Sequence, residues 1–265
     1  ARRGFSTLLR LTVVHMDNNR KAILNVPVDI CQPEGFISEI EKKLHQPGVR
    51  TIFAINPEKV MAARKNQELS SALQEADFLI PDGIGIVFGL RMLYGERVSR
   101  TTGIMLMECL LKLADEKKLK VFIFGSQPQV NTMASGNIRK RYPSLDLVGT
   151  QHGYIPQEEY ESLVERVNSL RIDILFVGLG SPKQEKWIQR YKNALRVKIC
   201  IGIGGSLDVI AGKIPRAPLW LQNLGLEWFY RLVKEPKRIK RMYVLPLFLG
   251  YVGWEAVRIR VGSKQ

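Results

Sequence analysis

Short apolar, partly β-branched runs alternate with amphipathic stretches along most of the chain. Such runs are typical of strands buried on both faces of a sheet, whereas apolar residues spaced three and four apart indicate helices. The predicted strands are 51–55, 78–80, 120–124, 145–148, 172–177 and 197–203, and 21–30 is a strand or hairpin arm. The predicted helices are 35–45, 58–66, 70–76, 84–94, 103–118, 128–141 and 156–170. This alternation predicts an α/β fold with a doubly wound, Rossmann-like and mostly parallel sheet.

Composition divides the chain into three parts. Residues 1–20 begin without Met and are rich in Arg at the start, so we treat them as an N-terminal extension or an expression remnant outside the fold. Residues 21–215 carry the alternating pattern and are expected to form the Rossmann-like core. Residues 216–265 are basic and aromatic, and we expect them to form a helical C-terminal appendage.

The stretch 172–190 combines a buried strand, a glycine turn and a helix. Gly178 and Gly180 allow a sharp turn after the strand, and Ser181 with Pro182 is expected to be the N-cap and first residue of the helix. The unpaired amides and the positive dipole end of that helix would then form a binding site for a phosphate.

Two side chains in the first helical turn strengthen the phosphate interpretation. Lys183 supplies a cation and Gln184 an amide. The fold alone would accept any solvent-exposed polar residue at these two positions. The plainer alternative is a turn that binds nothing, with Lys183 and Gln184 as surface residues.

Other predicted strands also end in polar or glycine-rich turns. Because ligands of such sheets lie beyond the carboxyl ends of the strands, these turns are expected to line one crevice. The candidate binding residues are Asn56, Asp82, Gly125, Ser126, Gly178, Gly180, Gly204, Gly205, Ser206 and Asp208. Each one alone is equally explained as a turn residue that caps a helix, and only the whole set favours a site.

Motifs for nucleotide cofactors and metals are incomplete. The segment 178–183 lacks the third glycine of the dinucleotide fingerprint, and the chain has no P-loop and no Asp-x-Asp pair. The three cysteines are far apart without CxxC spacing and the three histidines are scattered: Cys31, Cys109, Cys200, His15, His45 and His152. We therefore expect no cofactor, no metal and a reduced, cytosolic compartment, with phosphate charge met by arginine, lysine and amides.

The charge of the chain predicts an anionic partner. There are 40 Lys and Arg residues against 25 Asp and Glu, a formal net charge of +15. Such an excess favours nucleic acid, acidic lipid or a phosphorylated substrate. Residues 213–265 hold eleven of the basic residues and three acidic ones, so the appendage carries about half of the excess.

The end of the appendage is apolar as well as basic. Residues 242–254 are uncharged and are interrupted by Pro246, Gly250 and Gly253, a stretch too short to cross a bilayer and suited to lying in its interface. With the surrounding cations it favours an anionic membrane surface. The alternative is a packed interface in a homo-oligomer.

Several strings together resemble the WecG/TagA/CpsF family of bacterial glycosyltransferases (glycosyltransferase family 26), over roughly residues 22–245. They are AINPEK (54–59), PDGIGIV (81–87), VGTQHGY (148–154), GLGSPKQE (178–185), GGSLDVIAGKIPRAP (204–218) and GLEWFYRLVKEPKRIKR (225–241). The resemblance implies an inverting, metal-independent transfer of an N-acetylmannosamine-type sugar from a UDP donor to a polyprenyl-diphosphate-linked GlcNAc-type acceptor. It implies a peripheral enzyme of cell-envelope polysaccharide synthesis, on the inner face of the bacterial plasma membrane. The alternative from another class is a nucleic-acid-binding Rossmann-like module, and the resemblance implies no nucleic-acid partner.

The resemblance also implies roles for individual residues. Asp82 matches the proposed catalytic base, Asn56 and Gln184 match residues that line the pocket, and Arg100 matches a binding arginine. The arginines that the family's appendage contributes correspond to Arg231, Arg238 and Arg241. A carboxylate at a strand end suits a base that takes the proton of the acceptor hydroxyl, and arginines suit a leaving diphosphate. For Asp82 the alternative is an N-cap of the helix 84–94.

Two positions depart from the family pattern. Ala54 stands where Thr is frequent, as in the WecG-like subgroup that uses N-acetylmannosaminuronate, and Met105 stands where the RxxGxD pattern has Asp. On this basis the chain is closest to that subgroup, and the donor sugar is N-acetylmannosamine, its uronate or another hexuronate.

Overall fold

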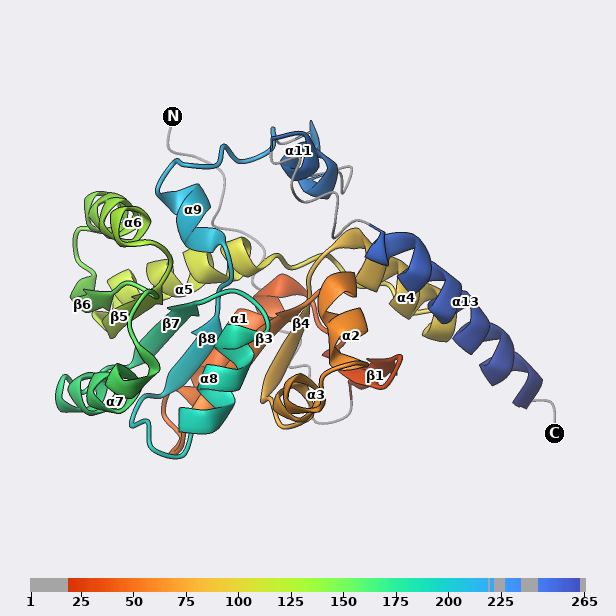
Figure 1. Cartoon of the computed structure of the whole chain (residues 1–265), viewed down its shortest axis with the longest axis horizontal. Coiled ribbons are helices and arrows are strands. Elements are labelled where there is room, and N and C mark those ends of the chain that lie inside the picture. The colour runs from red at the N-terminus through yellow and green to blue at the C-terminus, as the bar shows by residue number, and fades with distance from the viewer. Residues whose placement is uncertain (1–18, 219, 222–226, 235–242, 263–265) are drawn as a thin grey trace.

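The computed structural model describes residues 19–218, 220–221, 227–234 and 243–262. Its centre is a six-stranded sheet of order β4-β3-β8-β7-β5-β6, in which all neighbouring strands are parallel (Figure 1). The strands are β3 (Arg50–Ile55), β4 (Phe78–Pro81), β5 (Lys120–Gly125), β6 (Asp146–Gln151), β7 (Ile174–Gly178) and β8 (Ile199–Gly202). The predicted α/β class with a parallel, Rossmann-like sheet is confirmed.

A hairpin precedes the sheet. It consists of β1 (Arg20–Ile23) and β2 (Val26–Asp29), and the two residues at its tip, Leu24 and Asn25, both have positive φ, which matches the twist of a tight hairpin. The Asp29 carboxylate accepts a 2.7 Å hydrogen bond from the Leu79 amide, which attaches the hairpin to β4. The prediction of a single strand or arm over 21–30 is therefore right about strand structure and wrong about continuity, because the turn at Leu24 and Asn25 divides the range into the two arms.

Helices cover both faces of the sheet. One face carries α2 (Pro57–Ala63), α3 (Gln67–Gln74), α4 (Ile84–Tyr94), the 3-10 turn η2 (Gln157–Glu159) with α7 (Tyr160–Ser169), α8 (Lys183–Tyr191) and α13 (Val244–Gly262). The other carries α1 (Pro33–Lys43), α5 (Gly103–Lys117), α6 (Pro128–Arg141) and α9 (Ser206–Ile210). The helix α11 (Glu227–Lys234) belongs to the appendage.

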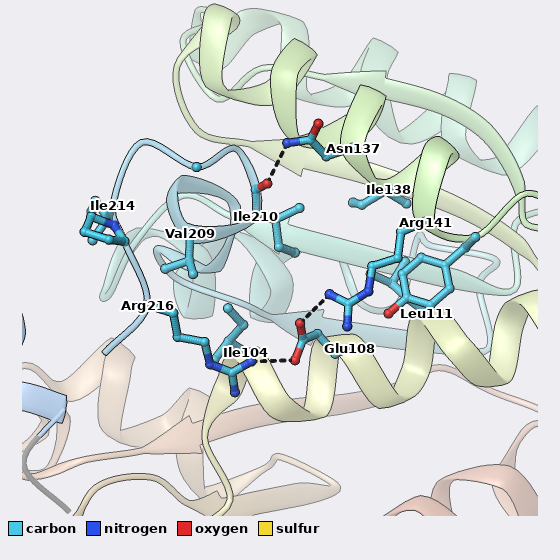
Figure 2. A pocket seen from close by; sticks show the side chains of 13 residues that line it. Ile104, Glu108, Leu111, Asn137, Ile138, Arg141, Val209, Ile210, Ile214 and Arg216 are labelled. Carbon is cyan, nitrogen blue, oxygen red and sulfur yellow. Dashed lines mark hydrogen bonds and ion pairs between the residues drawn. The ribbon is translucent and has the colours of Figure 1, made fainter. Parts of the chain in front are cut away.

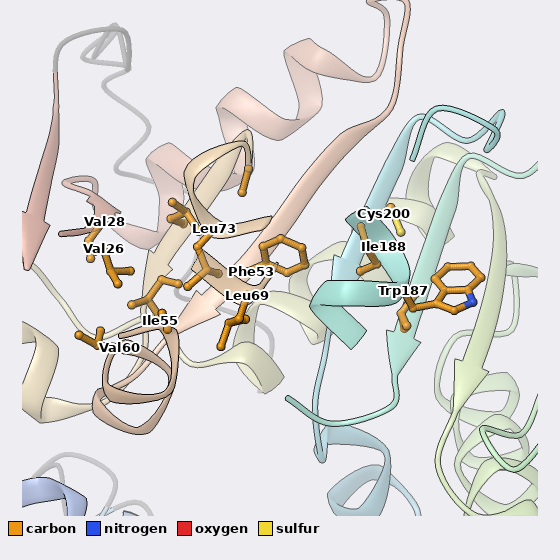
Figure 3. Close-up of a cluster of buried hydrophobic side chains, with 14 of the residues drawn as sticks. Val26, Val28, Phe53, Ile55, Val60, Leu69, Leu73, Trp187, Ile188 and Cys200 are labelled. Atoms are coloured by element: carbon orange, nitrogen blue, oxygen red, sulfur yellow. The ribbon is translucent and has the colours of Figure 1, made fainter. Parts of the chain in front are cut away.

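Each face of the sheet has its own buried cluster. Side chains alternate along every strand, so Phe53 and Ile55 of β3 enter one cluster and Ile52 enters the other. Figure 3 shows part of the first cluster, where Phe53 lies near Leu69 and Ile188 is seated beside Cys200. Apolar burial on both faces is the main stabilising contribution to a sheet of this kind.

The predicted helices 84–94 and 128–141 have the bounds of α4 and α6, and the other predicted helices differ from the observed ones by one to four residues at an end, including the start of α8. Ser181 was expected as N-cap and Pro182 as first helical residue, but Pro182 occupies the N-cap position and the helix begins at Lys183. The reason is local: Gly180 has φ +77, and its carbonyl accepts the 2.9 Å hydrogen bond from the Gln184 amide. The helix therefore begins one residue later than the Ser-Pro signal indicated.

The last helix, α13, runs without interruption through Pro246, Gly250 and Gly253. Pro246 is the third residue of the helix, where a missing amide hydrogen removes no intrahelical bond. Phe248 and Val252 are fully buried on one side of α13, against α4 and α2. The end of the appendage is thus packed on the core.

Among the described residues, no helix is both long and apolar enough to span a bilayer. Cys31, Cys109 and Cys200 are unpaired, and burial raises the pKa of the Cys200 thiol well above its ordinary value. That thiol is a packing group, because a thiol must ionise before it reacts as a nucleophile.

Candidate functional site

Asp82 and Asn56 lie side by side at the ends of neighbouring strands. Asp82 directly follows β4, and its amide donates a 2.7 Å hydrogen bond to the carbonyl of Ile55, the residue before Asn56. The Asn56 side chain accepts a 2.8 Å hydrogen bond from the Lys59 amide and so caps α2. The N-cap of α4 is Gly83, so the alternative that Asp82 caps this helix is wrong.

The turns after β5, β7 and β8 touch through their backbones. A Cβ atom on Gly125 would lie 2.4 Å from the Gly178 carbonyl oxygen, and one on Gly178 would lie 3.3 Å from the Gly204 carbonyl oxygen. The Ser126 amide donates a 2.9 Å hydrogen bond to the Gly178 carbonyl. Side chains larger than hydrogen do not fit at 125, which is why these three predicted turns lie so close together.

Gln184 is buried, whereas Lys183 is exposed. The Gln184 side chain is 2% exposed, and its Oε1 accepts a 2.9 Å hydrogen bond from the Gly204 amide. Its Nε2 donates a 2.8 Å hydrogen bond to Glu185 Oε1. The surface alternative therefore fails for Gln184, whose amide holds the turn after β8.

A buried ion pair that the sequence pattern did not predict is linked to these turns through Gln184. Lys59 Nζ is 2.7 Å from Glu185 Oε1, with side chains 4% and 0% exposed. Lys59 also donates a 2.7 Å hydrogen bond to the Ala54 carbonyl in β3. In the sequence both residues look like the polar face of amphipathic helices, so only the folded structure, which brings the Lys59 ammonium to the Glu185 carboxylate, reveals the pair.

Arg100 connects the strand edge to the appendage. Its Nη2 lies 3.2 Å from Glu227 Oε2, the first residue of α11, and both side chains are largely buried. The next residue, Thr101, donates its amide to the Pro81 carbonyl at 3.0 Å, immediately before Asp82. The start of α11 is thereby attached near Asp82.

For the three arginines predicted in the appendage, the structure describes only the backbone of one. Arg231 belongs to α11 by its backbone, and its side chain is not among the described ones. Arg238 and Arg241 lie outside the described residues.

The turn after β8 continues into α9. Gly205 is the N-cap of this helix, and the Ser206 hydroxyl donates a 2.7 Å hydrogen bond to the Ile203 carbonyl. The Asp208 carboxylate lies 3.5 Å from Lys213 Nζ. Ser206 and Asp208 therefore have clear structural roles at this edge.

A cavity of about 400 Å³ lies between α5, α6, α9 and the segment 214–216 (Figure 2). Its walls are mostly aliphatic. Glu108 lies between two arginines there, 2.7 Å from Arg141 and 3.0 Å from Arg216. The hydrogen bond from Arg141 to Glu108 raises the pKa of the arginine. None of the predicted binding residues lines this cavity, so it was not anticipated from the sequence.

No cluster of three or more His, Cys, Asp or Glu side chains in the described part of the chain is arranged to hold a metal ion. The polar side chains placed at or near the carboxyl edge include the carboxylates of Asp82 and Asp208, the amides of Asn56 and Gln184, and the guanidinium of Arg100, together with backbone groups of the glycine turns. Such a set suits a proton acceptor next to an anion-binding surface.

Comparison with known proteins decides the family. The profile of the "Glycosyl transferase WecG/TagA/CpsF family" matches residues 21–262. The chain belongs to this family. It is 34% identical over 229 residues to the N-acetylglucosaminyldiphosphoundecaprenol N-acetyl-beta-D-mannosaminyltransferase of Bacillus subtilis (strain 168), covering 86% of the chain and 89% of the relative. The protein of the same name from Staphylococcus aureus (strain MRSA252) is 34% identical over 242 residues, covering 90% and 94%.

The resemblance predicted from the motifs is thus confirmed, and the protein is a glycosyltransferase of the hexosyltransferase type. The motifs that supported it coincide with the carboxyl edge: AINPEK holds Asn56, PDGIGIV holds Asp82 and GLGSPKQE holds Gln184. The roles of the individual site residues stay predictions.

Proposed function

We propose that this family member transfers N-acetylmannosamine, with inversion, from UDP-N-acetylmannosamine to a GlcNAc unit on a polyprenyl diphosphate. The names of the two relatives support this sugar and this acceptor. The observation that carries the proposal is the adjacency of Asp82 and Asn56 at the edge where the glycine turns meet. The uronate form of the donor is the alternative suggested by Ala54.

In this proposal Asp82 is the general base. It takes the proton of the acceptor hydroxyl as that hydroxyl attacks the anomeric carbon, which contributes roughly 10²–10⁴ in rate. The Nδ2 group of Asn56 donates a hydrogen bond to a sugar oxygen, because Oδ1 of the same side chain accepts the hydrogen bond that caps α2.

The donor diphosphate lies against the glycine turns after β5, β7 and β8. Backbone groups there approach a phosphate closely, because no side chain intervenes at Gly125, Gly178 or Gly204. The negative charge that grows on the leaving UDP is met by arginines. Arg231 is one helical turn after Glu227 in α11, which Arg100 attaches near Asp82.

The protein acts on a membrane surface through α4 and α13. On the side of α13 opposite its buried face, Leu247, Trp254 and Val257 are exposed. Ile84 and Phe88 of the adjoining α4 are 45% and 47% exposed. They lie close to Asp82 in the chain, so the exposed apolar surface extends toward the proposed site. An apolar surface with nearby cations is suited to an anionic bilayer interface, where the lipid-linked acceptor resides.

The test is a UDP-release assay with purified full-length protein. UDP-N-acetylmannosamine and its uronate are each supplied with a synthetic GlcNAc-diphosphate-lipid in vesicles, and the product is identified by mass spectrometry. We expect UDP release and a disaccharide-lipid with the neutral donor. Transfer of the uronate alone would correct the donor, and absence of transfer from both donors would overturn the proposal.

A further inference from the structure

One buried network connects the turns that follow β3, β7 and β8. Glu185 Oε1 lies 2.7 Å from Lys59 Nζ and accepts a 2.8 Å hydrogen bond from Gln184 Nε2. Gln184 Oε1 accepts a 2.9 Å hydrogen bond from the Gly204 amide. A backbone group at the carboxyl edge is therefore held by side chains that lead from α2 through α8.

The network also includes the turn after β3. The Lys59 ammonium donates to the Ala54 carbonyl, while the Lys59 amide donates to the Asn56 side chain. One residue thus contacts both the last part of β3 and the cap that follows it. The positions of Asn56 and Gly204 are coupled through the bonds of Lys59, Glu185 and Gln184.

Stability alone does not account for these charges. Removing two charges from water opposes folding, and replacing a buried ion pair by apolar residues of similar size is often neutral or stabilising. Among the described residues, Glu185 Oε2 is buried and has no hydrogen-bond partner, which is a further unfavourable contribution. What the network supplies is directional bonds that define one arrangement of the turns.

We infer that Lys59 and Glu185 are positioning residues of the transferase. Through Gln184 they orient the turn at Gly204, and Lys59 orients the turn at Asn56. The inference rests on the proposed function in one respect, namely that the donor UDP lies against these turns. Both side chains are almost fully buried, so they act through the turns and do not touch the substrate.

The decisive variant removes both charges and keeps the volume, Lys59→Met with Glu185→Leu. We expect it to fold, because no buried charge is left unpaired, and to have a moderately lower Tm, because the Gln184 amide and the Ala54 carbonyl lose their partners. We also expect kcat/KM and UDP affinity to fall by about 10–100-fold, since small displacements at an active site have effects of this size. Calorimetry with UDP and the UDP-release assay measure these quantities. Wild-type kcat/KM and UDP affinity in this variant would overturn the inference.

A matched control removes an ion pair at the surface of the same helix. Lys192, the C-cap residue directly after α8, has its Nζ 2.8 Å from the carboxylate of Glu75, which is half exposed. The variant Lys192→Gln with Glu75→Gln should keep wild-type UDP affinity and turnover. An equal loss of UDP affinity in this control would show that α8 responds to any charge removal, and it would also contradict the inference.

Hydrogen exchange gives a readout that needs no catalysis. In Gln184→Met the Gly204 amide loses its acceptor, and exchange in a peptide covering 200–207 should become faster, as it should in the charge-free double variant. If exchange accelerates in neither variant, the network does not hold the turn, even if UDP binding has changed. If the wild-type protein transfers no sugar, the proposed function fails, and this measurement still decides the coupling of the turns.

Discussion

At the scale of single residues, Asp82 lies directly after β4 at the carboxyl edge of the sheet, and it is not the N-cap of α4. Its amide is bonded to β3, Gly83 serves as the N-cap of α4, and the carboxylate sits at the carboxyl edge beside Asn56. A half-buried carboxylate at this place is suited to accept a proton from a bound hydroxyl.

The variant Asp82→Asn tests this role. It preserves the shape of the side chain and removes its basicity, so kcat should fall by about 10²–10⁴-fold. UDP affinity, measured by calorimetry, should stay within about threefold of wild type, because a general base acts on the acceptor hydroxyl in the transition state and does not hold the UDP. A parallel loss of UDP affinity and Tm would instead assign Asp82 a structural role.

Gln184 shows where prediction from residue types ends. Its place in the first turn of α8 was predictable from the strand, the glycines and the amphipathic pattern that follow one another in the chain. Its burial was not, because it depends on the Gly204 amide, twenty residues later in the sequence. Lys59 and Glu185 were missed for the same reason: an ion pair between two helices leaves no periodic signal in either of them.

At the scale of elements, the helices with strong local signals were predicted with the observed bounds, as α4 and α6 show. The strand order was not predictable, since it depends on which strands meet after the chain has returned to the centre of the sheet. The course of α13 was also missed, because Pro246 and two glycines suggested a broken segment. The packing of Phe248 and Val252 on α4 stabilises the continuous helix.

The variant Phe248→Ala measures how firmly α13 is attached. Phe248 is fully buried, and a Cβ atom on Gly89 would lie 3.6 Å from its ring, so truncation leaves a cavity. The free energy of unfolding in urea should fall by about 3–5 kcal/mol. Trp254→Ala, at a side chain 71% exposed in the same helix, is the control and should change it by less than about 0.5 kcal/mol. Equal effects of the two variants would mean that α13 is not docked in solution.

At the scale of the whole molecule, the positive charge and the exposed apolar side chains gather in the appendage. Arg258 and Arg260 are exposed near the end of α13, on the helix that also exposes Trp254. A surface of this kind combines long-range attraction to anionic lipid with short-range insertion of apolar groups.

Vesicle sedimentation separates these two contributions. Each cation near an anionic surface contributes about 1 kcal/mol, so Arg258→Gln with Arg260→Gln should weaken binding to anionic vesicles by about 30-fold at low salt. The same variant should bind neutral vesicles as the wild type does, whereas Trp254→Ala should bind both kinds more weakly. Unchanged binding in all variants would place the membrane contact elsewhere.

The contact between Phe248 and the small residues of α4 has a mechanical consequence. A Cβ atom on Gly85 would lie 2.6 Å from Pro57 of α2 and 3.8 Å from the Phe248 ring, and one on Gly89 would lie 3.2 Å from Ile23 and 3.6 Å from that ring. These glycines therefore keep α4 close to α2, to the hairpin and to α13, and α4 begins two residues after Asp82. Because of this packing, we expect α13 and the start of α4 to move together. The tilt of α13 in a lipid layer would therefore set the height and angle at which Asp82 meets the headgroups, so bulkier residues at 89 should misalign the enzyme with its substrate without altering a single catalytic group.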